Sequence, residues 1–376
     1  MIRFLHTSDW QLGMTRYFLS EGPQERYNQS RFDAIRTLGK IAKEANCQFM
    51  AVCGDVFESN QVDRKTIARA LEALKEVPVP VWIIPGNHDP LNEASVFLSS
   101  SFIQGKPNHI EVITDVSPIQ IGENLELVGA PWLSKRMDVN PFYKAIAPLE
   151  PVTGVTRIIM AHGIIDSFTP KKDDPLILSA ESLEHVINEK KSSFIALGDR
   201  HTRTKIGAGE RIWYSGTPEV TDFGEEDAGY AQIVELDCDK VKVTPAQVGQ
   251  WRFVEKNRVD INSIEDIETL RHMLEELDKK ERTVVKLNLV GSISLTKEAT
   301  LRQSLDTISE VFASCQINDK DLLVVPDDAD FSDLGFSGFI ESTITQLREK
   351  MEGNESEKGI AREALMLLVR LRGGAV

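Results

Sequence analysis

Short polar segments rich in metal-ligand residues recur between Ser8 and His201, each directly after an apolar run. The segments are SDWQ, GDVFE, GNHD, AHG and GDRH, and the runs before them are IRFLHT, FMAV, VWIIP, RIIM and FIAL. Because a β-strand delivers its last residues to one edge of a sheet, five strand ends can converge on one crevice. The polar side chains that would meet there are Asp9, Gln11, Asp55, Asn87, His88, His162, Asp199 and His201.

These oxygen and nitrogen donors are sufficient to hold two divalent cations, and they predict a metal-dependent hydrolase. Hydrolysis of a phosphate ester needs a nucleophile at neutral pH and compensation of the charge on the phosphoryl oxygens. Two cations roughly 3.5–4 Å apart provide both, because a water between them loses a proton readily. Since two cations at that distance repel each other, a carboxylate must bridge them. Asp55, which follows Gly54 at a predicted tight turn, is the best candidate.

The donor set also indicates which metals fit. Oxygen ligands favour Mn²⁺ or Mg²⁺, whereas the imidazoles of His162 and His201 add affinity for transition metals. Mn²⁺ satisfies both tendencies, and Zn²⁺ or iron stay open because a sequence does not set the metal supply. Beside the predicted ligand Asn87, His88 is available to protonate the leaving oxygen or stabilise the transition state, and Asp89 could orient it.

Any one of these segments alone is a weak signal. A lone GD or HG is common, and a lone histidine is more often structural than a ligand, although GNHD seldom serves packing. Five segments in this order, each after a predicted strand, favour the metal site. The remaining histidines are interpreted as structural or exposed: His6, His109, His185 and His272.

The elements that must position these residues alternate between strands and helices in the first half, which predicts a sheet with helices on its faces. From about residue 110 strands and turns dominate. Two layered sheets that bring strand ends to a common edge fit this order. Apolar spacing predicts helices at residues 31–45, 64–76, 93–97, 180–189 and 264–282.

A chain of 376 residues is long for one domain and comfortable for two. The sequence predicts a catalytic domain over residues 1–255, a small α/β domain over 256–334 and a helical segment over 335–376, in which GNESEKG breaks two helices. The apolar run ALMLLVRL near the C-terminus is expected to pack in a core; binding of a partner helix is the alternative.

The formal net charge is −15, which lowers the expectation of nucleic acid as a substrate. Local basic clusters and bound cations can still dominate the field near a cleft. Arg200, Arg203, Lys205 and Arg211 surround the last polar segment. DNA contacts are predicted for Arg16, Arg200, Arg203 and Lys205, with a solvated loop as the alternative. The acidic run GEED (224–227) is most simply a solvated loop.

Composition indicates a reducing compartment. The four cysteines are scattered, without a CxxC pair, and are interpreted as structural. No apolar stretch reaches the roughly 18 residues that cross a bilayer, and the N-terminus lacks the pattern of a signal peptide. The sequence therefore predicts a cytoplasmic protein that does not associate with membranes.

The sequences of these segments resemble those of a known family. HTSDWQLG, GDVFES, IPGNHD, AHG and YSGTPE are similar to the calcineurin-like metallophosphoesterase superfamily, and in particular to its SbcD-type DNA repair exonucleases, over about residues 1–250. The resemblance implies an α/β fold: a two-layer β-sandwich flanked by helices, followed by a small α/β capping domain and C-terminal helices. It also implies a homodimer that works with an SbcC-type coiled-coil ATPase on DNA ends.

The resemblance further implies a ligand set. One metal site would use Asp9, Gln11, Asp55 and His201, the other would use Asp55, Asn87, His162 and Asp199, and His88 matches the catalytic histidine of the family. The family usually has histidine where Gln11 and Asp199 stand. The first site is therefore expected to be weaker, and the second to shift towards Mn²⁺ or Mg²⁺. Because both replacements offer an oxygen donor, an active enzyme is favoured over a metal-poor relic.

Three functions are weighed. The favoured one is a Mn²⁺-dependent exonuclease in DNA repair, with endonuclease action also open. A phosphoesterase for nucleotides or cyclic nucleotides would suit the acidic charge, and a non-catalytic subunit that binds DNA ends or an ATPase would suit the altered ligands. For assembly, the apolar face of helix 64–76 is expected to pack on the sheet, with a dimer interface as the alternative: Ile67, Ala70, Leu71 and Leu74.

Overall fold

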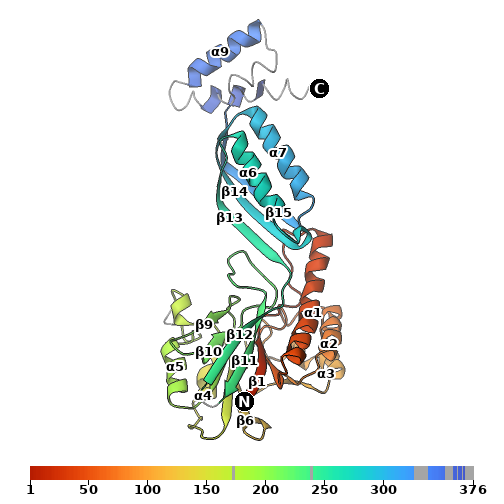
Figure 1. The fold of residues 1–376 in the computed structure, drawn as a ribbon, viewed down its shortest axis with the longest axis vertical. Helices are drawn as coiled ribbons and strands as arrows, with labels where there is room; N and C mark the ends of the chain where they lie inside the picture. The colour runs from red at the N-terminus through yellow and green to blue at the C-terminus, as the bar shows by residue number, and fades with distance from the viewer. Residues whose placement is uncertain are drawn as a thin grey trace. The chain divides into compact units, whose positions relative to one another are not determined.

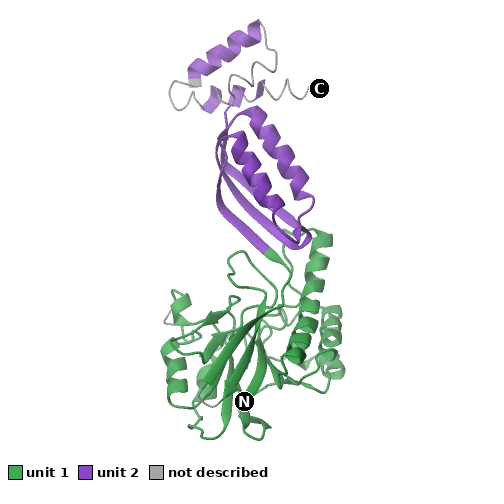
Figure 2. Cartoon of the chain, in the orientation of Figure 1, with its two compact units in different colours: residues 1–252 green, residues 253–376 purple. Residues whose placement is uncertain are grey.

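The structure of the chain, a computed structural model, describes residues 1–171, 174–237, 240–325, 338–351, 359–361, 363–365 and 367–368 (Figure 1). The chain forms two compact units, Met1–Arg252 and Phe253–Val376 (Figure 2). The three-part division predicted from the sequence, with boundaries after residues 255 and 334, stays a prediction.

The first unit contains two six-stranded sheets. The first sheet has the order β12-β11-β1-β2-β3-β4. Strands β1 to β4 run parallel, and β11 pairs with β1 in the antiparallel direction. The parallel strands therefore end at the same edge. The strands of this sheet are β1 (Ile2–Thr7), β2 (Phe49–Cys53), β3 (Val81–Ile84), β4 (Ile110–Val112), β11 (Tyr230–Asp237) and β12 (Lys240–Gln247).

The second sheet has the order β5-β6-β7-β8-β10-β9. Strands β6, β7, β8 and β10 run parallel, and β5 and β9 are antiparallel edge strands. Its strands are β5 (Ile119–Gly122), β6 (Leu125–Gly129), β7 (Thr156–His162), β8 (Phe194–Gly198), β9 (Thr204–Lys205) and β10 (Ile212–Tyr214).

A buried apolar layer joins the two sheets. Phe4 of β1 stacks on Phe49 of β2 with ring centroids 5.0 Å apart, and Phe194 of β8 meets Phe4 edge-on at 5.6 Å. Strands β2, β7 and β8 are buried almost throughout, as expected for strands covered on both faces. The predicted α/β class and the two-layer sandwich are confirmed.

Helices cover the outer face of each sheet (Figure 1). Helices α1 (Glu21–Glu44), α2 (Arg64–Lys75) and α3 (Ser100–Gly105) pack on the first sheet, and α4 (Pro141–Ile146) and α5 (Ala180–Asn188) pack on the second. The apolar face of α2 is buried against the first sheet, so the prediction that it packs in the core is confirmed.

Two helix predictions in the first unit were wrong. Helix α1 begins ten residues before the expected residue 31, because its first turns are polar and lack apolar spacing. No helix spans 93–97; a 3₁₀ turn at Val96–Leu98 precedes α3. The Asn92 side chain accepts the N–H of Ala94, and its carbonyl accepts the N–H of Ser95, a local turn that competes with a helix.

Residues 252–325 form a three-stranded sheet with two α-helices. Strand order is β13-β14-β15, with β14 and β15 parallel. A capping box of Ser263 and Asp266 starts α6, which ends at Glu275 rather than near residue 282. Strand β13 was not predicted, since its sequence RFVEKNRVD is mostly charged and exposed. The elements are β13 (Arg252–Asp260), α6 (Ile264–Glu275), β14 (Thr283–Ile293), α7 (Leu295–Ser309) and β15 (Ser314–Val324).

The described C-terminal residues include α9 (Phe339–Met351) and short helical stretches between 359 and 368. Leu365 is buried and packs with Ile344, so this residue of the apolar run ALMLLVRL lies in a local core. Most of GNESEKG, the end of that run and Cys238 lie outside the described residues. Cys47, Cys53 and Cys315 are free thiols. Across the described segments, no helix is both long and apolar enough to span a bilayer.

Candidate metal centre

The predicted ligands come together where five parallel strands end. Asp9 and Gln11 follow β1, Asp55 follows β2, and Asn87 follows β3. In the second sheet His162 is the last residue of β7, and Asp199 follows β8. Backbone hydrogen bonds join these ends: the Asp9 N–H donates to Gly54 O at 3.0 Å, and the Gln11 N–H donates to Asp55 O at 3.0 Å.

The backbone is strained at these residues. Asp9, Gln11, Asp55 and Asp199 have φ values of 55°, 49°, 54° and 95°, in the left-handed region that L-residues rarely adopt. They are four of the eight non-glycine residues with positive φ in the described chain. Such strain persists where the surrounding structure over-determines it, and it gathers at functional sites.

Two glycines permit the close packing of the loops. Gly54 has φ +89°, and a Cβ there would lie 2.2 Å from Nδ1 of His162. A Cβ on Gly86 would lie 2.1 Å from Oδ1 of Asp55. The GD and GN pairs of the segments therefore have a steric reason, because the glycine lets a neighbouring ligand approach the backbone.

His162 directs one ring nitrogen into a ring of oxygen atoms. Its Nδ1–H donates to Cys53 O at 2.8 Å, which leaves Nε2 as the lone-pair nitrogen of the neutral ring. Nε2 lies 2.7 Å from Asn87 Oδ1, 3.4 Å from Asp55 Oδ2 and 3.6 Å from Asp199 Oδ1. None of these oxygens carries a proton to give while the acids are ionised, so Nε2 needs either a second proton on the ring or a metal ion.

A second cluster forms around Asp9. His201 Nε2 lies 3.8 Å from Asp9 Oδ1, and the Asp199 N–H donates to Asp9 Oδ2 at 3.1 Å. Ligand atoms of Asp9, Asp55 and His162 all lie within 4.8 Å of one another, a spacing at which they could hold a metal ion. The structure thus brings all the predicted ligands to one edge of the sandwich.

The electrostatics of the cluster favour a bound cation. Burial alone would lower the pKa of His162, but Asp55, Asp9 and Asp199 raise it well above the usual value. The pKa of His201 rises to about 9, against the effect of burial, through Glu225, Asp9 and Asp199. Burial raises the pKa of Asp199 to about 6. Each imidazole thus binds a proton tightly among the carboxylates, in a position where a metal ion can replace it.

Gln11 supplies a direct test of fit for a metal. Its Nε2 donates to Asp55 Oδ2 at 3.2 Å, while its Oε1 is buried and has no hydrogen-bond donor among the described residues. A buried acceptor without a donor is unfavourable by about 1–3 kcal/mol. A divalent cation is a partner that would satisfy it, so the donor set fits the metal centre.

His88 and Asp89 take different places beside the cluster. The His88 N–H donates to Asp55 Oδ1 at 3.0 Å, its Nδ1–H donates to Glu58 O at 3.0 Å, and its Nε2 lies 4.0 Å from Asp55 Oδ2. The side chain is 39% exposed, so a substrate can reach it. Asp89 is buried and accepts the N–H groups of Gly86 at 2.7 Å and Phe57 at 3.0 Å. It therefore holds two loops together, and no contact between its carboxylate and the His88 ring is observed in the described residues.

Three residues near the ligands were not singled out from the sequence. Ser8 Oγ donates to Asp9 Oδ2 at 2.5 Å, and Thr217 Oγ1 donates to Asp9 O at 2.8 Å. Glu225 Oε1 accepts from His201 Nδ1 at 2.7 Å. Ser8 and Thr217 lie in the segments SDWQ and YSGTPE, so their position beside ligand motifs was an available signal. Glu225 lies in the acidic run GEED.

Three of the four predicted DNA-contacting side chains, those of Arg200, Arg203 and Lys205, are engaged with protein groups. Arg200 lies over the Phe168 ring at 3.9 Å and donates to Thr204 Oγ1. Arg203 pairs with Asp227 at 3.3 Å, and Lys205 pairs with Glu210 at 3.0 Å. The Arg16 N–H donates to Gln24 Oε1, and Arg16 Nε is buried. The two acid pairs reduce the charge that Arg203 and Lys205 offer to a phosphate, and the DNA contacts stay predictions.

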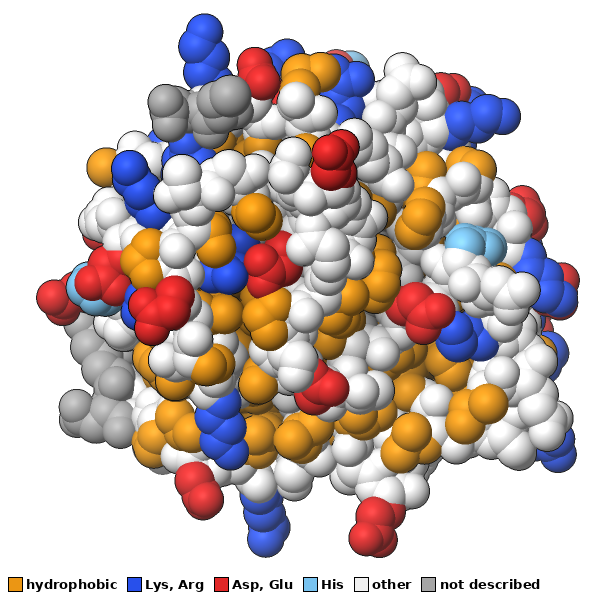
Figure 3. All heavy atoms as spheres, turned by 90° about the horizontal axis from the view of Figure 1, so that it is seen from below, with side chains coloured by type: hydrophobic (Ala, Val, Ile, Leu, Met, Phe, Trp, Pro, Cys, Tyr) orange, Lys and Arg blue, Asp and Glu red, His pale blue; other side chains and the backbone are white. Residues whose placement is uncertain are grey.

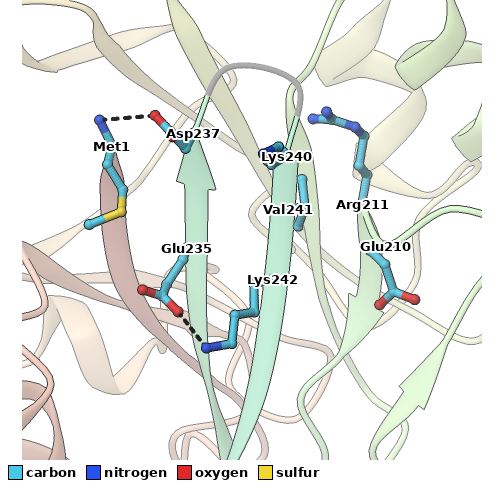
Figure 4. Close-up of a pocket in the computed structure, with 8 residues that line it drawn as sticks. All are labelled: Met1, Glu210, Arg211, Glu235, Asp237, Lys240, Val241 and Lys242. Atoms are coloured by element: carbon cyan, nitrogen blue, oxygen red, sulfur yellow. Dashed lines mark ion pairs between the residues drawn. The ribbon is translucent and has the colours of Figure 1, made fainter.

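A separate hollow of about 640 Å³ lies at the other end of β1 (Figure 4). Met1 lines it, whereas Asp9 follows the opposite end of the strand. Two pairs of its charges are in contact: the Met1 amino group with Asp237, and Lys242 with Glu235. Figure 3, a view from below, shows hydrophobic side chains among scattered charges and, for the described residues, no dense group of Lys and Arg on that face. We assign no catalytic role to this hollow.

Comparison with known proteins agrees with the site. Residues 2–234 match the calcineurin-like phosphoesterase family. The DNA double-strand break repair protein Mre11 of Saccharolobus solfataricus is 24% identical over 324 residues, which cover 83% of this chain and 80% of that protein. The SbcD component of the SbcCD nuclease of Bacillus subtilis is 24% identical over 287 residues, or 67% and 69% of the two chains. The uncharacterized metallophosphoesterase YhaO of Bacillus subtilis is 22% identical over 339 residues, or 82% and 78%.

The family match spans more than half of the chain, so this chain belongs to the calcineurin-like phosphoesterase family. Its class is that of metal-dependent hydrolases with a dinuclear metal site. The resemblance to the SbcD-type branch, recognised in the sequence motifs, is confirmed by the Mre11 and SbcD relatives.

Proposed function

We propose that this chain is a Mn²⁺-dependent nuclease that hydrolyses phosphodiester bonds at DNA ends in DNA repair. The observation that supports it most is the group of oxygens around His162 Nε2, where three oxygen atoms surround the ring nitrogen that a metal ion could occupy. We infer DNA as the substrate from the names of two relatives, a DNA double-strand break repair protein and a nuclease subunit. Exonuclease action is the proposed reaction, and endonuclease action is a second one that the same assay detects.

Two sets of residues would hold the cations. Asp9, Gln11, Asp55 and His201 form one set. Asp55, Asn87, His162 and Asp199 form the other, with Asp55 shared. Bound divalent cations neutralise charge on the phosphate and lower the pKa of water, so that a nucleophile forms near neutral pH. Amide and carboxylate oxygens at Gln11 and Asp199 favour Mn²⁺ or Mg²⁺ over metals that prefer nitrogen.

His88 is proposed to protonate the leaving oxygen. The hydrogen bond from Nδ1–H to Glu58 O fixes the ring, so that a proton on Nε2 points away from the backbone. Nε2 lies 4.0 Å from Asp55 Oδ2, which is too far for a hydrogen bond between them. The exposed side chain then transfers the proton to substrate oxygen, as a general acid must.

Partners follow from the relatives alone. We propose that the chain acts as a homodimer with an SbcC-type coiled-coil ATPase, since one relative is named as a component of the SbcCD nuclease. Light scattering of the purified chain tests the dimer. Co-purification with a coiled-coil ATPase encoded in the same genome tests the second partner.

The nuclease proposal is tested with end-labelled single- and double-stranded DNA in the presence of Mn²⁺. Asp55→Asn keeps the size of the bridging residue but removes its charge, and cleavage should fall by more than about 100-fold. Asp138→Asn, at an exposed position outside the cluster, is the matched control and should cleave like the wild type. Chelation by EDTA should abolish cleavage.

Equal cleavage by wild type and Asp55→Asn would show that a contaminant cuts the DNA and would contradict the proposal. Rapid hydrolysis of nucleotides or cyclic nucleotides without DNA cleavage would favour a small-substrate phosphoesterase. Less than one bound Mn²⁺ per chain at saturation would favour a non-catalytic subunit.

A further inference from the structure

The acidic run Gly224–Asp227 does not behave as one solvated loop. Glu226 and Asp227 are exposed, but Glu225 turns inward, and only 8% of its side chain is accessible. Its carboxylate lies beside His201, 24 residues earlier in the chain. The neighbouring acids therefore have different surroundings, although the sequence presents them as equivalent.

The inward carboxylate is held from three sides. Glu225 Oε2 accepts the N–H of Thr221 at 2.7 Å, and Oε1 accepts the Thr221 hydroxyl and Nδ1 of His201, the latter at 2.7 Å. Thr221 Oγ1 is also 2.7 Å from His201 Nδ1. The backbone bond fixes the carboxylate, and the carboxylate in turn fixes the imidazole.

The opposite nitrogen of the same ring faces the ligand cluster. His201 Nε2 lies 3.8 Å from Asp9 Oδ1, too far for a hydrogen bond between them. When Nδ1–H donates to Glu225, the neutral ring must present its lone pair at Nε2. A carboxylate behind an imidazole also makes that nitrogen a stronger donor to a cation.

We infer that Glu225 is a positioning residue for one of the two cation sites: it sets the tautomer and orientation of His201 and strengthens its Nε2 as a ligand. The inference rests on the proposed metal-dependent function. It concerns the site that contains Gln11, whose neutral amide is the weakest donor of the set. A negative charge behind His201 compensates for that weakness, which explains how a site with an amide ligand can still bind metal.

The competing explanation is that Glu225 only caps the turn that begins at Thr221. A turn cap would stabilise the loop, and its loss would lower stability without a selective effect on metal binding. A positioning residue would change the affinity of one cation site and leave the other unchanged. Metal binding measured separately from activity distinguishes the two.

The experiment measures Mn²⁺ binding to the full chain after EDTA treatment and dialysis, by calorimetry and by electron paramagnetic resonance of free Mn²⁺. Glu225→Gln should lower the affinity of one site by about 10–100-fold and leave the other unchanged. Glu226→Gln, which alters the adjacent exposed acid, should bind both ions like the wild type. Glu225→Asp keeps the charge on a shorter side chain and should recover part of the lost affinity.

Urea unfolding in EDTA shows whether each variant folds. If Glu225→Gln does not fold, Mn²⁺ binding is compared in Glu225→Asp instead. Two sites of wild-type affinity in Glu225→Gln would overturn the inference but leave the proposed function standing. An equal loss in Glu225→Gln and Glu226→Gln would also overturn it, because the effect would then follow net charge. A wild-type chain that binds no Mn²⁺ would overturn the inference and the proposed function together.

Discussion

At the scale of single residues, the centre is defined by two imidazoles among carboxylates. The fold fixes one nitrogen of each ring on a protein acceptor, Cys53 O for His162 and Glu225 for His201. The other nitrogen of each ring faces the acidic cluster. Because a metal ligand must be deprotonated, a cation and a proton compete for the same two nitrogen atoms.

Mn²⁺ binding should therefore release protons. The pKa of His201 is about 9, so its ring carries a second proton at pH 7 in the metal-free chain. The carboxylates around His162 raise the pKa of that ring in the same direction. Affinity should rise as the pH increases from 6.5 towards 9, since fewer protons must then be displaced. Calorimetry at pH 7.5 in two buffers of different ionisation enthalpy measures the release; heats independent of the buffer would contradict it.

Replacement of His88 should separate chemistry from metal binding. His88→Asn removes the proposed acid but none of the predicted ligands, and DNA cleavage should fall by about 10²–10⁴-fold. Mn²⁺ affinity should stay unchanged in the same protein. His185→Asn, at a ring that is 66% exposed, is the control for a histidine replacement. Loss of a bound Mn²⁺ in His88→Asn would mean that His88 is itself a ligand.

Sequence was sufficient to predict which polar residues meet at the strand ends, because each stands beside a glycine or an apolar strand in a short motif. It did not identify Glu225, because a carboxylate held by a side chain 24 residues away leaves no local pattern. It suggested that Asp89 orients His88, whereas the structure shows the two Asp89 oxygens on backbone N–H groups. Local spacing shows which residue types are present, but hydrogen-bond partners depend on the folded loops.

At the scale of elements, apolar spacing predicted α2 well and the start of α1 poorly. Helix α2 has a regular apolar face that is buried on the first sheet. The first turns of α1 are polar, so a helix that continues into solvent-exposed residues had no apolar signal. Strand β13 was missed for a similar reason: it is charged and largely exposed, and pairing within the sheet defines it.

The position of α2 gives a test of core packing against dimer formation. Leu74 is fully buried in the first unit, so Leu74→Ala should lower the free energy of unfolding by about 2–5 kcal/mol. Leu98→Ala, at a position 49% exposed, should change it by less than about 0.5 kcal/mol. Urea denaturation measures the free energy of unfolding of both variants. Light scattering should find the same oligomeric state for both variants as for the wild type. If Leu74→Ala were monomeric where the wild type is a dimer, with unchanged free energy of unfolding, the apolar face of α2 would instead be a dimer interface.

At the scale of the whole first unit, one buried histidine joins the two sheets. His6 of β1 lies between Gln232 of β11, 3.2 Å from its Nδ1, and Leu197 O of β8, 3.1 Å from its Nε2. The first partner belongs to the same sheet and the second to the opposite one. The sequence analysis expected His6 to be either structural or exposed. The observed contacts make it a structural residue of the sandwich core.

Burial lowers the pKa of His6 to about 4, despite its two hydrogen bonds. In the unfolded chain the ring takes up a proton near pH 6.5, so between these values the unfolded state binds more protons than the folded one. Stability from His6 is thus lost as the pH falls, by about 2 kcal/mol between pH 7 and pH 5. Urea unfolding of wild type and His6→Gln in EDTA measures how the stability of each depends on pH. The pKa values of Asp89 and Asp199, about 7 and 6, lie in the same pH range, but both residues are present in the two proteins, so their contribution cancels when the two profiles are subtracted. His272→Gln, at an exposed ring, should follow the wild type. Parallel pH profiles for wild type and His6→Gln would mean that the ring already carries a proton in the fold.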